Sequence, residues 1–151
     1  MKKITFIILF TFSLLHSFGV NPFLLGTWKG YIISNELDAD NRDGLPITLY
    51  INSDNDNGDF VGEMYVSYRY QTDIYNAKYM VKGSLDINTF VLRMNQTEIV
   101  YYDVLPKGMS WCFGQFKLNM YQSNYMRKII LDGSMNTECS ESNIRVVLVK
   151  K

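Results

Sequence analysis

The chain has 151 residues, the length of one ordinary domain, which leaves no room for a second. Hydrophobic residues make up 47% and charged residues 20%, a composition that excludes a disordered chain and a coiled coil. Fifteen basic and fifteen acidic residues give zero net charge, so charge does not favour a nucleic-acid-binding protein. Tyrosine occurs eleven times and alanine only as Ala39 and Ala77, a bias that favours strands over helices.

Residues 1–19 have the pattern of a secretory signal peptide. Two lysines form a basic start, residues 4–15 are nearly all apolar, and Ser17-Phe18-Gly19 places small residues where signal peptidase cleaves. The apolar run is shorter than the roughly 20 residues that span a bilayer. The alternative for this segment is a buried N-terminal helix. We expect an exported protein, periplasmic or secreted, that does not span a membrane and whose single domain covers residues 20–151.

Cleavage would also remove two lysines and the only histidine of the chain. Lys2 and Lys3 leave with no acidic companion, so thirteen basic residues face fifteen acidic ones, a net charge of −2. His16, the only histidine, leaves as well. Without imidazole the chain cannot build a Ser-His-Asp triad, a Cys-His dyad or a zinc site that needs histidine. We therefore expect a protein that is not an enzyme and that carries no cofactor.

The mature chain is predicted to form nine short strands, several of which show strict alternation of apolar and polar side chains. They cover residues 28–33, 47–51, 60–70, 76–85, 90–94, 99–104, 111–120, 127–133 and 144–149. Turn residues such as Asn, Asp, Gly and Pro separate them. This spacing, with no helical pattern between strands, predicts an all-β antiparallel meander that closes as one barrel of about eight or nine strands. A β-sandwich is the alternative.

The alternating strand directions assign inward side chains to two ends of the barrel. Trp28 falls at one end with four glycines, which let a barrel wall bend and narrow. The other end would be an open mouth that a small apolar ligand could enter. Its candidate ligand-binding residues are Tyr68, Tyr70, Tyr79, Met94 and Met120. Plain core packing is the alternative interpretation of the same five residues, because a small barrel has room for side chains or for one small ligand.

Residues 25–30, Leu-Gly-Thr-Trp-Lys-Gly, resemble the G-x-W signature that opens lipocalins and the broader calycin barrels. In that family the Trp seals the closed end and an Arg late in the chain packs across it. The resemblance therefore implies these roles for Trp28 and Arg145, and it implies that the long loop at 35–44 covers the mouth. The chain departs from the family in two respects. No helical pattern precedes its last predicted strand, and the Thr-Asp motif that the family carries before a late strand is absent, since Thr72-Asp73 falls too early.

Cys112 and Cys139 are the only cysteines, and export favours a disulfide between them. Cys139 is the only apolar residue of segment 136–143, so burial does not explain its presence. Strand order places its loop at the same end of the barrel as Cys112. The bond would close a separation of 27 residues and stabilise the fold by roughly 3.5 kcal/mol in the chain-entropy model. Two free thiols are the alternative.

The acidic residues offer two further kinds of site, and we expect neither. Loops 38–44 and 54–59 contain carboxylates and amides, but neither has the spacing or the closing Glu of a calcium loop, and tight turns use the same residues. Glu63, Glu98 and Asp103 do not pair across one cleft as glycosidase carboxylates must. The sequence therefore predicts no metal site and no catalytic residues.

These features favour an exported, non-catalytic barrel that binds a small, mostly apolar molecule at its open rim. The alternative is an interaction or inhibitor module, in the cell envelope or secreted, that presents its loops to a protein partner.

The predicted signal peptide can be tested on exported protein. N-terminal sequencing should show a chain that begins near Val20, because the small residues Ser17 and Gly19 direct cleavage after Gly19. Exported protein that still begins at Met1 would contradict the prediction.

Overall fold

The computed structural model describes residues 23–54 and 58–151, so the predicted signal peptide lies outside the described residues. Eight strands follow one another in the chain. They are β1 (Gly26–Ile33), β2 (Leu45–Asp54), β3 (Asp59–Tyr70), β4 (Asp73–Asp86), β5 (Val91–Tyr102), β6 (Gly114–Ser123), β7 (Lys128–Thr137) and β8 (Ser140–Lys150). One short 3-10 helix, η1 (Ala39–Asn41), lies between β1 and β2.

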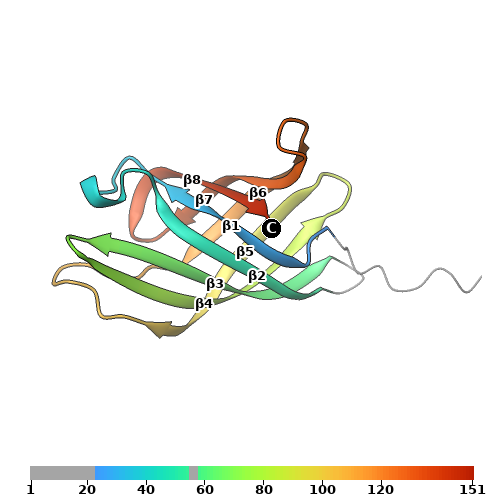
Figure 1. Ribbon diagram of the computed structural model, residues 1–151. Helices are drawn as coiled ribbons and strands as arrows, with labels where there is room; N and C mark the ends of the chain where they lie inside the picture. The colour runs from blue at the N-terminus through green and yellow to red at the C-terminus, as the bar shows by residue number, and fades with distance from the viewer. Residues whose placement is uncertain (1–22, 55–57) are drawn as a thin grey trace, which may run out of the picture.

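Each strand pairs antiparallel with the next, and β8 pairs with β1, so the sheet closes on itself as a barrel (Figure 1). The predicted antiparallel meander barrel is confirmed, and the β-sandwich alternative is excluded. Every ladder joins strands that are neighbours in sequence except the seam between β1 and β8. That seam runs from Trp28 opposite Lys150 to Ile33 opposite Arg145.

The barrel has eight strands, within the predicted eight or nine, because two of the nine predicted segments form one strand. Segments 90–94 and 99–104 are not separate, because β5 continues through Asn95, Gln96 and Thr97 instead of turning there. Gln96 is buried on the inward face, where its Nε2 donates to Met64 Sδ at 3.4 Å and its Oε1 accepts from the backbone N–H of Gly114 at 2.7 Å. A polar triplet that is typical of turns is here the middle of a long strand. The missing turn reverses the direction of every later strand relative to the prediction.

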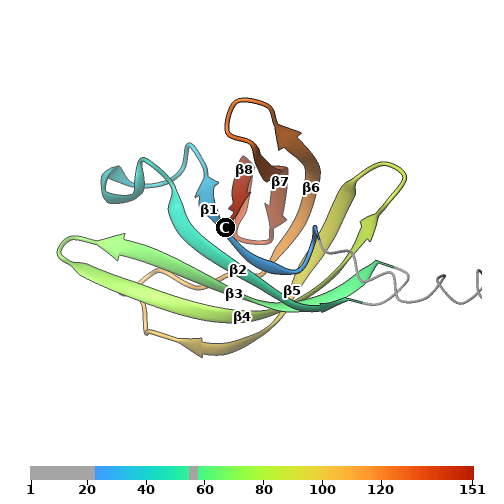
Figure 2. The same ribbon diagram turned by 45° about the vertical axis from the view of Figure 1, so that its right-hand side comes forward.

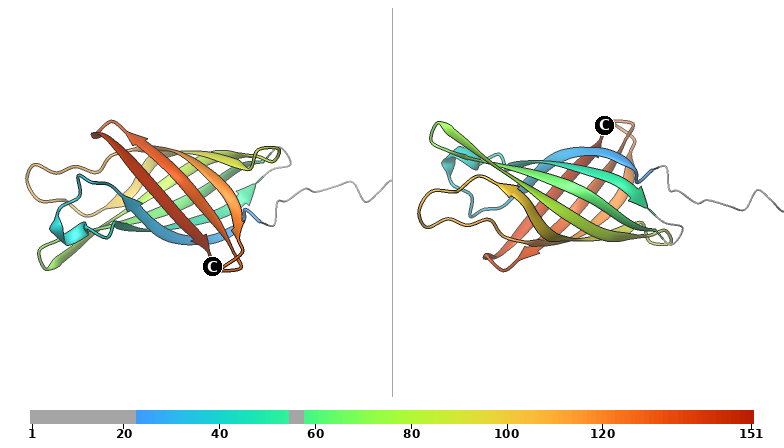
Figure 3. Two further views of the ribbon diagram at one scale, coloured as in Figure 1. Left: turned by 90° about the horizontal axis from the view of Figure 1, so that it is seen from above. Right: turned by 90° about the horizontal axis from the view of Figure 1, so that it is seen from below.

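The two ends of the barrel differ in what they carry. The β1–β2, β3–β4, β5–β6 and β7–β8 connections lie at one end, which we call the mouth, and Figure 3 shows η1 and the β5–β6 loop together there. The start of β1 and the β2–β3, β4–β5 and β6–β7 connections lie at the other end, which we call the plugged end.

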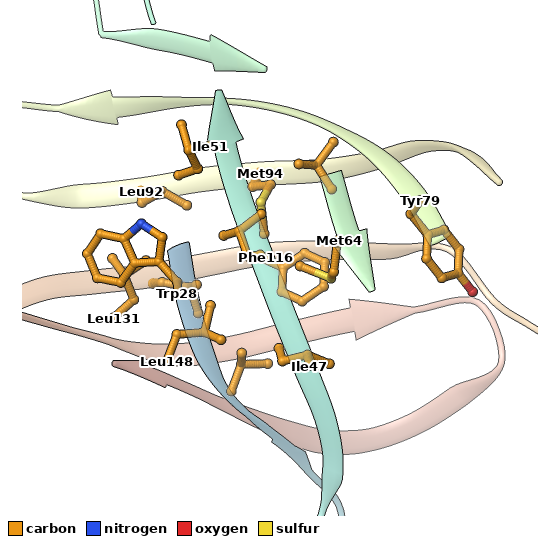
Figure 4. Packing of buried hydrophobic residues seen from close by; sticks show 14 of the residues in the cluster. Trp28, Ile47, Ile51, Met64, Tyr79, Leu92, Met94, Phe116, Leu131 and Leu148 are labelled. Carbon is orange, nitrogen blue, oxygen red and sulfur yellow. The ribbon is translucent and has the colours of Figure 1, made fainter. Parts of the chain in front are cut away.

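Apolar side chains fill the barrel between its two ends (Figure 4). Many of the large inward side chains are at most 2% exposed, and these include Trp28, Leu49, Met64, Leu92, Met94, Leu118, Leu131 and Leu148. An internal space large enough for a ligand would leave the side chains around it accessible. Their complete burial therefore means that the middle of the barrel is packed core.

Trp28 closes the plugged end. It is 0% exposed, and its Nε1 donates to the backbone carbonyl of Leu24 at 2.9 Å. The Nζ of Lys150 lies 5.6 Å from the centre of the indole ring, a cation–π contact, and donates to the carbonyl of Phe23 at 2.7 Å. The chain that enters β1 and the end of β8 therefore meet around one ring.

Arg145 does not occupy the position that the family resemblance implied. Its guanidinium is on the outer wall, where Nε and Nη2 donate to the two carboxylate oxygens of Asp132 at 3.0 and 2.8 Å. The reason is the period of the strand. Ile144 and Val146 are buried on the inward face of β8, so Arg145 points outward, whereas Lys150 lies on the inward phase at the strand end.

Two glycines let neighbouring strands approach closely. A Cβ on Gly30 of β1 would meet the backbone carbonyl of Val147 in β8, and one on Gly133 of β7 would meet that of Lys117 in β6. No other residue fits at either position without a backbone shift. Glycine at these positions therefore permits the close approach of β1 to β8 and of β7 to β6.

The two tryptophans provide a test of the inward and outward faces. Trp28→Ala should destabilise the mature protein by about 3–5 kcal/mol, because it empties the plugged end. Trp111→Ala should cost clearly less, because Trp111 is only half-buried in a loop. Urea unfolding of both variants, with the disulfide intact, measures the difference. A larger loss for Trp111→Ala would contradict the packing described.

Candidate functional site

The barrel splays open at its mouth. The ladder between β5 and β6 covers only Val91–Asn95 and ends where Asn95 lies opposite Gln115. Beyond that point β5 continues beside β4, and β3 and β4 form a long hairpin that extends past the rest of the barrel (Figure 2). The chain crosses from β5 to β6 by the loop 103–113, so this loop and the long hairpin frame the mouth.

The β1–β2 loop is fixed to the β3–β4 hairpin through η1. Asn41 is 3% exposed, its Nδ2 donates to the carbonyl of Arg69 at 2.6 Å, and its Oδ1 accepts from the N–H of Arg69 at 3.0 Å. The Asn41 amide therefore pairs with the edge of β3 as a neighbouring strand would. Gln71 N–H donates to Asp40 Oδ2 at 2.8 Å at the tip of the hairpin.

Asp38 and Tyr68 form a second contact between this loop and the hairpin. The Tyr68 hydroxyl donates to Asp38 Oδ2, and the N–H of Asn41 donates to Asp38 Oδ1 at 3.1 Å. Desolvation opposes ionisation of Asp38, but the hydrogen bonds from Tyr68 and Asn41 outweigh it and lower the pKa of that carboxyl. Burial and the bond to Asp38 raise the pKa of Tyr68 to about 12. Tyr68 thus holds a loop in place.

A disulfide joins Cys112 to Cys139, as predicted, with the Cα atoms 6.1 Å apart. It ties the β5–β6 loop to the turn between β7 and β8. The other end of that loop is anchored by Asp103, whose N–H donates to the carbonyl of Asn76 and whose Oδ2 accepts from the N–H of Asn76, both at 2.8 Å. The indole Nε1 of Trp111 donates to the carbonyl of Asp103, also at 2.8 Å. The loop is therefore held at both ends.

The structure does not bring the five predicted ligand-binding residues together. Tyr68 and Tyr70 are at the end of β3, and Tyr79 is inside the barrel below them. Met94 is in the middle of the barrel, where it lies opposite Gly83 of β4 on one side and Phe116 of β6 on the other. Met120 is in the part of β6 near the plugged end. Met94 and Met120 lie away from the mouth because β5 continues through Asn95-Gln96-Thr97, where the prediction assumed a turn.

Tyr79 lies at the mouth end of the packed core, against the β5–β6 loop. The residue is 2% exposed, and its ring meets Phe113 of the β5–β6 loop edge to face, with centroids 5.9 Å apart. Its hydroxyl hydrogen-bonds to no described residue, and in Figure 4 the oxygen points away from the packed core. Burial raises the pKa of Tyr79 to about 12. No buried side-chain oxygen of the described residues lacks a partner, so this hydroxyl reaches solvent and is a polar group available at the mouth.

Sequence reasoning missed Phe113 and Gln96. The predicted strand 111–120 includes Phe113, whereas Phe113 belongs to the loop before β6 and lies against Tyr79. Gln96 was assigned to a turn. Its signal was present in the sequence, because Leu92, Met94 and Gln96 continue one alternation.

Residues 23–54 and 58–151 contain no group of three His, Cys, Asp or Glu side chains that could hold a metal ion, and no helix there is long and apolar enough to cross a membrane. A surface hollow of about 510 Å³ lies on the outer wall of β2 and β3, away from the barrel interior. Its lining residues are Thr48, Tyr50, Asn52, Glu63 and Tyr65.

The fold is a closed, eight-stranded antiparallel meander barrel with the general shape of a lipocalin barrel. No protein-family model, curated protein or solved structure matches the chain. The site must therefore be interpreted from its own geometry.

The raised pKa of Tyr79 makes stability depend on pH in the alkaline range. Between pH 10 and 12 the unfolded chain releases this phenolic proton while the native state keeps it, so the free energy of unfolding falls as pH rises. The contribution is about 1.4 kcal/mol at pH 11. Urea unfolding at pH 8 and pH 11 should therefore show a smaller loss for Tyr79→Phe than for the parent protein.

Tyr125→Phe is the matched control, because Tyr125 is 97% exposed and should leave the pH dependence unchanged. Equal losses for Tyr79→Phe and the parent protein would show that burial does not raise the pKa of Tyr79.

Proposed function

We propose that the protein is an exported, non-catalytic barrel that binds a small, mostly apolar molecule at its mouth, between Tyr79 and the β5–β6 loop. The observation that carries this proposal is the Tyr79 side chain, whose ring is buried and whose hydroxyl lacks a partner among the described residues. The ring offers apolar contact area and the hydroxyl offers one hydrogen bond, the combination that orients a ligand in a mainly apolar site.

The packed core limits where the ligand can lie. Met64 and Leu49 are 0% exposed, so a bound molecule cannot pass below Tyr79. It would take the position of loop side chains, above all Phe113, which is 39% exposed and contacts Tyr79. The ligand is therefore small, and it binds at the rim rather than deep in the barrel.

Export and the absence of catalysis are supported by the chemistry of the chain. The disulfide between Cys112 and Cys139 suits an oxidising compartment, in agreement with the signal-peptide pattern. His16, the only histidine, precedes the expected cleavage point. Glu63 pairs with Lys78 at 2.8 Å on the outer wall, and Asp103 holds Asn76, so these carboxylates have structural partners.

An apolar fluorescent probe tests the site. N-phenyl-1-naphthylamine should bind the mature protein saturably, and Tyr79→Trp should weaken binding at least about tenfold, because the larger ring occupies the space in front of the hydroxyl. Tyr65→Trp, on the outer wall, should leave probe affinity unchanged. Native mass spectrometry of protein purified from its own host should show a bound molecule.

Binding of the probe that does not saturate, or that both substitutions weaken equally, would contradict the proposal. So would protein from the host that carries no molecule and takes up no probe.

The alternative function, recognition of a protein partner, is favoured by one observation. Large apolar side chains are exposed near the end of β5, with Val100 at 50%, Tyr101 at 55% and Tyr102 at 56%. An exposed cluster of this kind marks an interaction surface in many soluble proteins.

A further inference from the structure

The surface hollow on the outer wall of β2 and β3 has aromatic and polar side chains on both strands. Its volume of about 510 Å³ lies within the range of clefts that hold small ligands. Three residues that point outward along β2 line it from one side, and they are Thr48, Tyr50 and Asn52. Glu63 and Tyr65 of β3 line the other side, with Glu63 opposite Tyr50 and Tyr65 opposite Thr48. We call this feature the outer-wall hollow.

The side chains that β3 and β4 contribute are fixed by contacts with one another. Lys78 of β4 pairs with Glu63 Oε1 at 2.8 Å, and its Nζ lies 5.4 Å from the centre of the Tyr65 ring. The Tyr65 hydroxyl donates to Glu63 Oε2 at 3.3 Å. The rings of Tyr65 and Tyr50 meet edge to face, with centroids 5.6 Å apart. Two rings and a carboxylate are thus held in place before a ligand arrives, which lowers the entropy cost of binding.

The polar groups that β2 contributes are not used in this way. Across the described residues, no side chain or backbone group hydrogen-bonds to the hydroxyls of Thr48 and Tyr50 or to the amide of Asn52. The register with β3 shifts between Ile51 and Ser53, so Asn52 lies opposite no residue of β3. Bulges of this kind redirect a side chain at many functional sites. One side of the hollow therefore presents two hydroxyls and an amide, which can both donate and accept hydrogen bonds.

The charges of the outer-wall hollow favour an uncharged, polar ligand. The hydrogen bond from Lys78 lowers the pKa of the Glu63 carboxyl, so the two charges persist together at neutral pH. A cationic ligand would have to displace Lys78 from the carboxylate, and an anionic ligand would meet the charge of Glu63. An apolar ligand would remove the hydroxyls and the amide of β2 from water without pairing them, which costs free energy.

We propose that the outer-wall hollow binds a neutral sugar unit of a glycan chain. The C–H groups of a sugar ring can pack on Tyr50 and Tyr65, which are 37% and 39% exposed, and its hydroxyls can pair with the groups of β2 and with Glu63. The row from Thr48 to Asn52 spans about 13 Å at about 3.3 Å per residue, which is longer than one sugar ring. A chain of sugars therefore fits this wall better than a single sugar does.

This inference goes beyond the proposed function and does not depend on it. The outer-wall hollow lies outside the barrel, whereas Tyr79 lies inside the mouth. Failure of one proposal leaves the other standing.

Oligosaccharides of different charge test the kind of ligand. Isothermal titration calorimetry at pH 6 would compare three neutral tetrasaccharides, namely cellotetraose, maltotetraose and N-acetylchitotetraose, with two charged ones. The charged probes are the deacetylated chitosan tetramer, which is cationic, and tetragalacturonate, which is anionic. At least one neutral tetrasaccharide should bind saturably and at least about tenfold more tightly than either charged one, because the Glu63–Lys78 pair favours neither charge.

Substitutions locate the site on the wall. Asn52→Ala should weaken binding of the neutral tetrasaccharide about fivefold, the effect of one hydrogen bond. Tyr50→Ala removes a ring and should weaken it at least about tenfold. Tyr121→Ala is the matched control, because Tyr121 belongs to β6 and is 46% exposed, and it should leave the affinity unchanged.

An NMR titration of the parent protein needs no variant. The neutral tetrasaccharide should move the amide resonances of residues 48–52 and 63–65 and leave those of the mouth loops in place. Three results overturn the inference: none of the neutral tetrasaccharides binds, a charged one binds as tightly, or the shifts lie elsewhere on the protein.

Discussion

Closure of β8 on β1 is the constraint on which the rest of the structure depends. It fixes which face of every strand points inward, and it brings the two ends of the barrel domain together at Trp28, between the carbonyl of Leu24 and the ammonium of Lys150. Burying this indole seals one end of the cylinder, so access is left to the other. The position of the mouth, its loops and its disulfide follow from that asymmetry.

The interior shows how little space a closed barrel of eight strands leaves. Inward side chains meet across the axis, and their burial leaves no volume for a ligand below Tyr79. Polar side chains are therefore found mainly at the mouth. There the strand ladders have ended, and hydrogen bonds of Asn41 and Asp103 to backbone groups take their place. The polar groups that order the mouth are side chains bonded to backbone, and sequence periodicity does not reveal such partners.

The sequence allowed the fold class and part of the site to be predicted. Alternation is a direct consequence of strand geometry, so it identified most strands, and an unexplained cysteine in a polar segment identified the disulfide. Gln96 could not be placed from composition, because its buried amide is satisfied by Met64 and Gly114, which are far from it in sequence. Lys150, and not Arg145, lies over the Trp28 ring. Predicting this requires knowing which residues of β8 point inward, since a shift of one residue moves a side chain to the other face of the sheet.

The disulfide encloses only a small part of the barrel. The covalent ring from Cys112 to Cys139 contains all of β6 and β7, a local hairpin, whereas the seam between β1 and β8 joins the two ends of the domain without any covalent link. Bringing such distant segments together carries a large loop-closure entropy and slows folding. Oxidation can therefore fix the hairpin before the cylinder exists, and it leaves the seam free to open. The seam along β1 is held by backbone pairing and side-chain packing alone.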